Sequence, residues 1–269
     1  MPLSKSFLNK ISKIKIKMSK VYVIASGKGG TGKSTSVVNL ASALTNFKQN
    51  VVIADLNFTT PNLGLYFGAP IVPVTLNHVL QGKASVDEAI YEHETGVKII
   101  PSSLSLKDTN KLNYKLLEEV IKKLKKNFTH IIFDSASGLG QEAKIALESS
   151  DEVIIVTNPN ILSITDALKT IKLAEEMKKP VKGVIITRVR GDKNEMPKAN
   201  VEEMLEVPIL GIVPEDSAVE ESLCKKNPVI KTRPRSRASR AYIDIAAKIL
   251  GKQKKPESFV QKFIRAVFG

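Results

Sequence analysis

Hydrophobic residues gather in short, continuous runs that begin at residue 21. The runs are rich in β-branched residues and do not alternate with polar positions, which is the pattern of strands covered on both faces of a sheet. We therefore predict strands at VYVIAS (21–26), VVIADL (51–56), VKIIPS (97–102), HIIFDS (130–135), EVIIVT (152–157), VKGVIIT (181–187) and VPILGIV (207–213).

The stretches between these runs have the apolar spacing of helices that pack one face on a core. Helices are predicted over residues 34–46, 112–126, 139–149, 161–178 and 238–250. Strands that alternate with helices predict an α/β fold with an open, mostly parallel, twisted sheet and helices on both faces. No repeat or low-complexity stretch interrupts residues 20–250, so we interpret them as one domain.

The most informative motif, GKGGTGKST, follows the first predicted strand and opens the first predicted helix. It satisfies the phosphate-binding pattern G-x-x-x-x-G-K-[ST] in the strand–helix context that this pattern requires. Backbone amides of such a loop converge on phosphate oxygens, and the start of the helix adds its positive end. We expect Lys33 to reach the β- and γ-phosphates and Ser34 to bind Mg²⁺. The predicted ATP-binding residues here are Gly27, Lys28, Gly29, Gly30, Thr31, Gly32, Lys33, Ser34 and Thr35.

A second lysine, Lys28, directly follows the first glycine of the loop. One chain does not need it to hold phosphate, and the form K-G-G-x-G-K-[ST] resembles the deviant Walker A loop of the MinD/ParA ATPase family. The resemblance extends over residues 18–269 and implies a P-loop fold, ATP and Mg²⁺ as cofactors, and an ATP-dependent homodimer. In that family the extra lysine crosses the dimer interface to the nucleotide of the partner subunit.

Two aspartates end predicted strands inside segments that are similar to the switch regions of this family. Asp55 precedes NFTTPNLGLYFG, which is similar to the first switch, and Asp134 lies in HIIFDSASGL, which is similar to the second. The resemblance implies that Asp134, with Ser34, helps to hold the metal. The alternative for both aspartates is that a carboxylate at a strand end caps the next turn.

Three positions depart from the family pattern. Ala136 stands where the second switch usually has proline, and Thr187 stands where relatives often have an asparagine that contacts adenine. We assign base contacts to Thr187, Arg188 and Pro214 by resemblance. Asn57 replaces the aspartate that helps to position the attacking water, and an amide can orient water but cannot accept its proton. The expected catalytic residues are Lys28, Lys33, Asp55, Asn57 and Asp134, with slow hydrolysis because of Asn57.

Composition and charge narrow the function classes. The net charge of +14 is concentrated in residues 1–20, 225–240 and 251–269, which points to an anionic partner. The single cysteine, Cys224, excludes an internal disulfide framework and any all-cysteine metal or iron–sulfur site within one chain. No apolar run is long enough to cross a bilayer, and lysines interrupt the N-terminus too often for a signal peptide.

The two ends of the chain look different from the domain. Residues 1–19 are a basic extension whose apolar residues have helical spacing, which predicts an amphipathic helix. The alternative is that translation starts at Met18. Residues 251–258 read as a linker. Residues 259–269 place apolar side chains on one stripe of a predicted helix, which resembles the membrane-targeting tail of MinD-type proteins. Packing on its own domain and a partner's groove are the alternatives. The stripe consists of Phe259, Val260, Phe263, Ile264, Val267 and Phe268.

These features predict a cytoplasmic MinD-like ATPase whose ATP-dependent dimer binds the inner face of the cell membrane reversibly. Such a protein would position the division machinery or another cellular assembly. Its partner would be a stimulating or cargo protein that the sequence does not identify. A ParA-type partition ATPase would instead bind DNA through the basic residues of 225–240, including Arg233, Arg235, Arg237 and Arg240. The third alternative is a slowly hydrolysing, nucleotide-gated scaffold.

Overall fold

The computed structural model describes residues 19–252. The predicted N-terminal helix, most of the linker and the apolar stripe of the tail, including Phe259, Val260, Phe263, Ile264, Val267 and Phe268, lie outside the described residues. Among the described residues, no helix combines the length and the apolar character that a transmembrane span needs.

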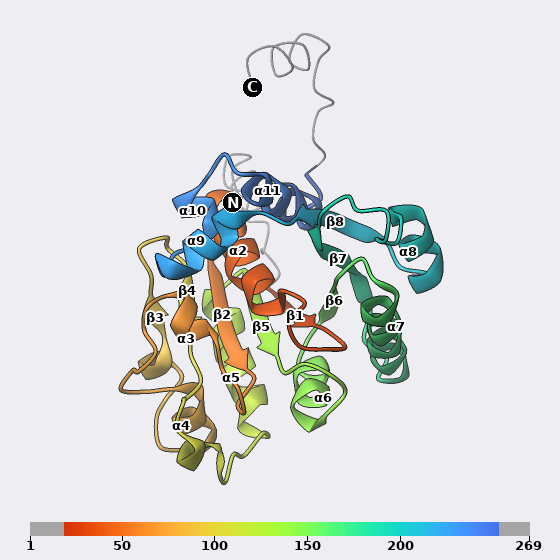
Figure 1. The fold of residues 1–269 in the computed structure, drawn as a ribbon. Coiled ribbons are helices and arrows are strands. Elements are labelled where there is room, and N and C mark those ends of the chain that lie inside the picture. Colours follow the sequence, from red (N-terminus) through yellow and green to blue (C-terminus); the bar gives the residue numbers. More distant parts are fainter. Residues whose placement is uncertain (1–18, 253–269) are drawn as a thin grey trace, which may run out of the picture.

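The centre of the fold is an eight-stranded sheet with the order β3-β4-β2-β5-β1-β6-β7-β8 (Figure 1). Every neighbouring pair is parallel except β3 and β4. The predicted open, mostly parallel sheet is therefore confirmed. Within residues 19–252, the two-residue β3 is the one strand that the hydrophobic pattern missed. The strands are β1 (Lys20–Ala25), β2 (Val51–Leu56), β3 (Tyr91–Glu92), β4 (Lys98–Ile100), β5 (His130–Ser135), β6 (Glu152–Thr157), β7 (Val181–Val189) and β8 (Ile209–Pro214).

Helices occupy each of the five predicted stretches. They are α2 (Lys33–Asn46), α5 (Leu116–Asn127), α6 (Gln141–Glu148), α7 (Ile161–Glu176) and α11 (Arg237–Ile249). The structure contains further helices that the hydrophobic pattern did not predict. They are short or lie late in the chain. These are α3 (Leu63–Tyr66), α4 (Leu76–Leu80), η1 (Asp87–Ala89), η2 (Leu106–Thr109), α8 (Lys198–Leu205), α9 (Ser217–Cys224) and α10 (Val229–Thr232).

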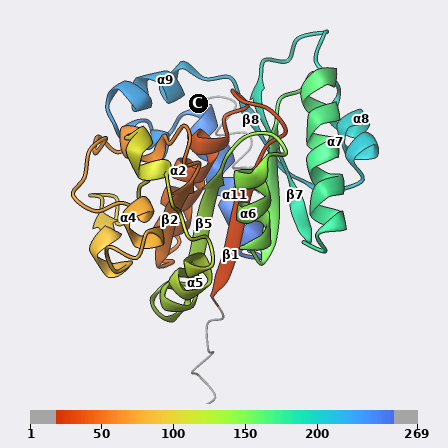
Figure 2. The same ribbon diagram turned by 90° about the horizontal axis from the view of Figure 1, so that it is seen from below.

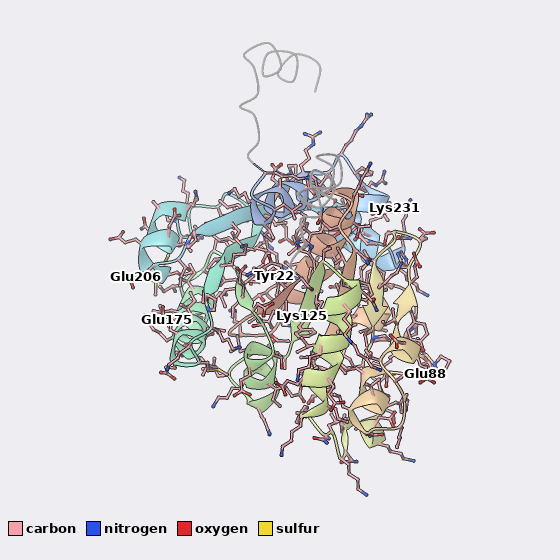
Figure 3. All side chains as sticks on the ribbon, turned by 180° about the vertical axis from the view of Figure 1, so that it is seen from behind. Tyr22, Glu88, Lys125, Glu175, Glu206 and Lys231 are labelled. Atoms are coloured by element: carbon pink, nitrogen blue, oxygen red, sulfur yellow. The ribbon has the colours of Figure 1, made fainter. Side chains whose placement is uncertain are left out.

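The sheet separates two apolar cores, and alternate residues of each strand serve different cores. On β1, Val21 and Val23 pack with α5, α6 and α7, whereas Tyr22 and Ile24 pack with α2 and α11. The two views in Figures 1 and 2 show these helices on opposite sides of the sheet. Figure 3 shows the other side of this arrangement, with Tyr22 inside and Glu206 and Lys231 at the periphery. Burial on both faces explains why the strand sequences are continuous apolar runs.

Strand β1 lies at the middle of the sheet, and the chain continues to β2 on one side and to β6, β7 and β8 on the other. Such a switch point leaves a crevice at the carboxyl ends of the strands, which is where open α/β sheets bind ligands. The glycine-rich loop leaves β1 at that point.

Candidate functional site

The loop between β1 and α2 is shaped by close contacts and by left-handed backbone. Gly32, which caps the start of α2, has φ +85°, a conformation that is costly for residues with a Cβ atom. A Cβ atom at Gly27 would lie 2.3 Å from the carbonyl oxygen of Asp166 in α7. The absence of a Cβ atom at Gly27 therefore lets the loop pass close to α7, whereas a Cβ atom at Gly29 would meet no atom within 4 Å.

The start of α2 is left free to bind an anion. No side chain caps its first turn, and the turn holds no acidic residue. The Ser36 hydroxyl instead donates to the Gly32 carbonyl oxygen at 2.8 Å and so fixes the end of the loop. Uncapped amides at a helix start, together with the helix dipole, favour a phosphate group.

Lys33 and Asp134 form a buried ion pair behind the loop. The Lys33 ammonium lies 2.7 Å from Asp134 Oδ1, with side-chain exposures of 6% and 0%. The second oxygen, Asp134 Oδ2, is buried without a hydrogen-bond partner among the described residues. An unpartnered carboxylate oxygen at this depth is costly unless a cation or water binds it. The Asp134 oxygen and the hydroxyl of Ser34, which lines the hollow at the phosphate loop, are oxygen ligands and therefore fit the predicted Mg²⁺.

Asp55 is the cross-strand neighbour of Asp134, because the two residues pair in register on β2 and β5. Its carboxylate accepts backbone N–H groups from Asn57, Asn62 and Leu63 at 2.9–3.0 Å. Burial and the Asp134 charge raise the pKa of Asp55 to about 7, although the three N–H donors lower it. Asp55 thus holds the first switch loop in place, as the capping alternative expected. Its participation in the reaction stays a prediction.

The Asn57 side chain also forms hydrogen bonds within this loop. Its amide nitrogen donates to the Thr60 carbonyl oxygen at 2.6 Å, and its oxygen accepts from the Thr60 amide and hydroxyl. Asn57 and Thr60 line the same hollow as the phosphate loop, which measures about 380 Å³. The residue is therefore at the site, and the structure gives it a role in loop shape that the sequence did not indicate.

Thr187, Arg188 and Pro214 come together in a narrower hollow beside Gly32. The Thr187 hydroxyl lies 2.5 Å from the Thr31 carbonyl oxygen and accepts from the Asn158 side chain. Its side chain consequently ties β7 to the phosphate loop. The three predicted base-contact residues are neighbours, and their contacts with a base stay a prediction.

Lys28 is a half-buried residue of the loop. Its carbonyl accepts the Ser26 hydroxyl, but its ammonium has no hydrogen bond or ion pair within residues 19–252. Two segments that contact the neighbouring residues Ser26 and Gly27 carry exposed apolar side chains. Leu139 follows Gly138, whose amide bonds the Ser26 carbonyl oxygen, and Ile161 and Leu162 open α7, the helix whose Asp166 lies against Gly27. Leu139 is 41% exposed, Ile161 54% and Leu162 70%.

Glu142, in the first turn of α6, is a site residue that the sequence analysis missed. Its carboxylate accepts the backbone amides of Phe58 and Thr59 and the Thr59 hydroxyl. It thereby joins the first switch loop to the helix that follows the second. An acid in the first turn of a helix usually serves that helix alone, so the sequence held no signal of this longer contact.

The basic segment 225–240 contains α10 and the start of α11 rather than an open loop. Arg233 forms a bidentate pair with Glu221, and Arg237 donates to the Glu215 carbonyl oxygen. Arg235 and Arg240 are exposed as well. The segment presents positive charge on the surface, but two of its four arginines are already engaged.

Known proteins that are similar to this chain include ATP-binding proteins and MinD proteins. An uncharacterized ATP-binding protein of Methanocaldococcus jannaschii is 41% identical over 258 residues, covering 94% of this chain and 98% of that protein. The structure of the Pyrococcus furiosus cell division ATPase MinD matches with a TM-score of 0.84 and 34% identity, over 88% of this chain and 100% of its own. The Pyrococcus horikoshii septum site-determining protein MinD, solved with Mg-ADP, matches with a TM-score of 0.83 and 33% identity over the same shares.

A family model also covers most of the chain. The model of the CobQ/CobB/MinD/ParA nucleotide binding domain matches residues 22–229, which include the phosphate loop and both switch aspartates. The chain thus belongs to the CobQ/CobB/MinD/ParA family of nucleotide-binding domains.

Proposed function

We propose that this protein is an ATPase of the MinD type, in which ATP and Mg²⁺ close a homodimer and the dimer holds itself on an anionic membrane through two C-terminal tails. The observation that carries the proposal is the Lys28 ammonium of the phosphate loop, which has no partner within residues 19–252, together with exposed apolar residues in the two segments that contact Ser26 and Gly27. A cation and an apolar surface in that place suit a second subunit that closes over the nucleotide.

The chemistry of the site supports ATP hydrolysis. A bound Mg²⁺ would supply charge neutralisation at the phosphate group. Asp134 Oδ2 and the Ser34 hydroxyl are the oxygens that would hold this ion, and Lys33 is the cation nearest to them. Phosphoryl transfer depends mostly on positioning and on charge neutralisation. Asn57 would orient the water without taking its proton.

The membrane step rests on the sequence of the tail. One short amphipathic anchor binds a bilayer marginally, whereas two linked anchors gain on the order of a hundredfold in avidity. Dimerisation would therefore convert the nucleotide state into residence on the membrane. Sedimentation with anionic vesicles tests the proposal: the protein should pellet with ATP and stay in the supernatant with ADP or without nucleotide. Equal pelleting in all three conditions would contradict it.

We expect Lys28→Ala to retain nucleotide binding but to lose ATP-dependent dimerisation, because the ammonium would serve the nucleotide of the other subunit. Light scattering with and without ATP measures this. Lys48→Ala, at an exposed position just beyond the C-terminal end of α2, removes the same charge away from the loop and should dimerise normally. If Lys28→Ala also dimerises normally, Lys28 does not act across an interface.

We expect Asn57→Asp to raise ATP turnover, since a carboxylate can both orient the water and accept its proton. It should also lower thermal stability, because a carboxylate cannot donate to the Thr60 carbonyl oxygen and the lost bond is worth about 1 kcal/mol. Phosphate release and a melting curve measure the two effects. Asn57→Ala is the control and should lower stability without raising turnover. An unchanged or lower rate in Asn57→Asp, with ATP still bound, would mean that another group positions the water.

A DNA-binding role of the ParA kind is the second candidate, because the arginines of 225–240 are all exposed. Contacts with DNA phosphates would give binding that falls steeply with salt. The variant Arg235→Glu with Arg240→Glu leaves the pair between Arg233 and Glu221 intact. It should abolish co-sedimentation with DNA if this role is correct, and leave ATP-dependent vesicle binding in place if the MinD-type role is correct.

A further inference from the structure

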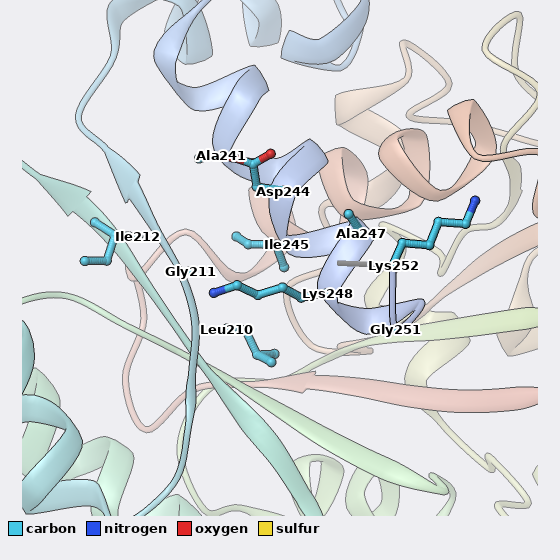
Figure 4. Close-up of a pocket in the computed structure, with 10 residues that line it drawn as sticks. All are labelled: Leu210, Gly211, Ile212, Ala241, Asp244, Ile245, Ala247, Lys248, Gly251 and Lys252. Atoms are coloured by element: carbon cyan, nitrogen blue, oxygen red, sulfur yellow. The ribbon is translucent and has the colours of Figure 1, made fainter. Parts of the chain in front are cut away.

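A groove lies between the edge strand β8 and helix α11. It is about 680 Å³ in volume, a size typical of pockets that hold ligands. Figure 4 shows Ile245 and Lys248 reaching from the helix toward the strand, with Leu210 beside them. The lining is mainly apolar and includes Leu210, Gly211, Ile212, Ala241, Ile245 and Ala247. An apolar groove of this size suggests that another apolar element covers it.

The described part of the chain ends at this groove. Helix α11 stops in a left-handed turn at Gly251 (φ +66°), whose amide bonds the Lys248 carbonyl oxygen at 3.0 Å. The Lys252 amide bonds the Ala247 carbonyl oxygen at 2.8 Å. This pair of bonds is the Schellman arrangement, which fixes where the chain leaves a helix. Both Gly251 and Lys252 line the groove themselves.

Residues 253–269 follow directly from that point. The Lys252 ammonium lies 4.7 Å from the centre of the Phe47 ring and so holds the exit in place. Six residues, 253–258, separate this exit from the apolar stripe that starts at Phe259. Such a linker spans up to about 20 Å when extended, and short linkers give effective concentrations in the millimolar range. The stripe is thus held within reach of the groove.

We propose that this groove is the docking site of the chain's own C-terminal segment, residues 259–268, when the protein is off the membrane. The segment carries Phe259, Val260, Phe263, Ile264, Val267 and Phe268, which in water would remain as an exposed apolar patch. Docking in the groove buries part of that patch within the same chain. It also keeps the segment from binding other surfaces.

Docking adds a regulatory step to the proposed function, on which this consequence rests. A tail in the groove is not available to a bilayer, so the vesicle and the groove compete for the same apolar side chains. Weakening the groove should therefore raise vesicle binding in the absence of ATP several-fold. The docking itself is independent of whether the tail binds membranes.

Fluorescence can follow the tail directly, because the chain contains no tryptophan. In the full-length Phe263→Trp variant without vesicles, we expect blue-shifted emission and weak quenching by acrylamide. Ala241→Arg, added to this variant, places a bulky charge in the groove and should shift the emission toward that of an exposed tryptophan. Ala247→Arg is a second groove variant, needed if Ala241→Arg does not fold. Ala199→Arg, at an exposed position of α8, is the matched control for the added charge.

The proposal stands if a folded groove variant shifts the emission, Ala199→Arg does not, and the shift is independent of protein concentration. It is overturned if Phe263→Trp already has the emission of an exposed side chain, or if neither groove variant changes it. A blue shift that disappears on dilution also overturns it, because the tail would then dock on a second copy. Docking without ATP-dependent vesicle binding would leave this inference intact and refute the membrane step of the proposed function.

Discussion

The Lys33→Ala variant is expected to lose measurable ATP binding. Lys33 is the buried cation at the start of α2, and we expect it to contact the β- and γ-phosphates. Hydrogen bonds to charged groups are worth about 1.5–3 kcal/mol each, so the loss of two corresponds to roughly 10²- to 10⁴-fold in affinity. Titration calorimetry with ATP and Mg²⁺ measures the loss.

The structure adds a second effect that the motif alone did not indicate. Removing Lys33 leaves the Asp134 carboxylate unpaired at 0% exposure, and breaking a buried pair from one side costs about 3–5 kcal/mol of stability. The double variant of Lys33→Ala with Asp134→Asn separates the two effects. It should recover much of the thermal stability without recovering ATP affinity. If the single variant binds ATP like the wild type, Lys33 does not contact the phosphates.

The Phe263→Glu variant is expected to abolish ATP-dependent vesicle binding and to leave nucleotide affinity and dimerisation unchanged. Phe263 lies in the middle of the predicted apolar stripe. Full burial of such a side chain is worth roughly 1.5–3 kcal/mol, and less at a half-immersed interface. The glutamate would also face anionic headgroups. Because the dimer binds through two tails, the apolar burial is lost in both subunits. Vesicle sedimentation across a salt series measures it, and salt should weaken the wild type only partly.

Gln261→Glu is the matched control, because it introduces the same charge on the polar side of the predicted helix. It should weaken vesicle binding much less than Phe263→Glu does. If Phe263→Glu still pellets with vesicles, the tail is not the anchor, and deletion of residues 1–17 tests the basic N-terminus instead. If Phe263→Glu melts at a lower temperature than the wild type, the tail contributes to the fold, as docking in the groove between β8 and α11 would produce.

The sequence alone determined the α/β architecture and the place of the glycine-rich motif between the first strand and the first helix. Strands buried on both faces must be continuous apolar runs, so β1 could be recognised without knowledge of its neighbours. The phosphate loop is equally local, because its chemistry depends on consecutive backbone amides and on Lys33, all within residues 27–35. The sequence did not predict short helices such as α3 and α10, because four residues are too few to show a hydrophobic period.

Only the tertiary structure decided what the side chains around this loop do. Asp55 and Asp134 become neighbours because β2 and β5 pair in register, although nearly eighty residues separate them in the sequence. Glu142 reaches the first switch loop, and the Thr187 hydroxyl reaches the Thr31 carbonyl oxygen, across similar or longer separations. The pairing of parallel strands brings their carboxyl ends to one edge, and side-chain partners at that edge follow from strand order and register. Neither property is encoded in any local stretch of the chain.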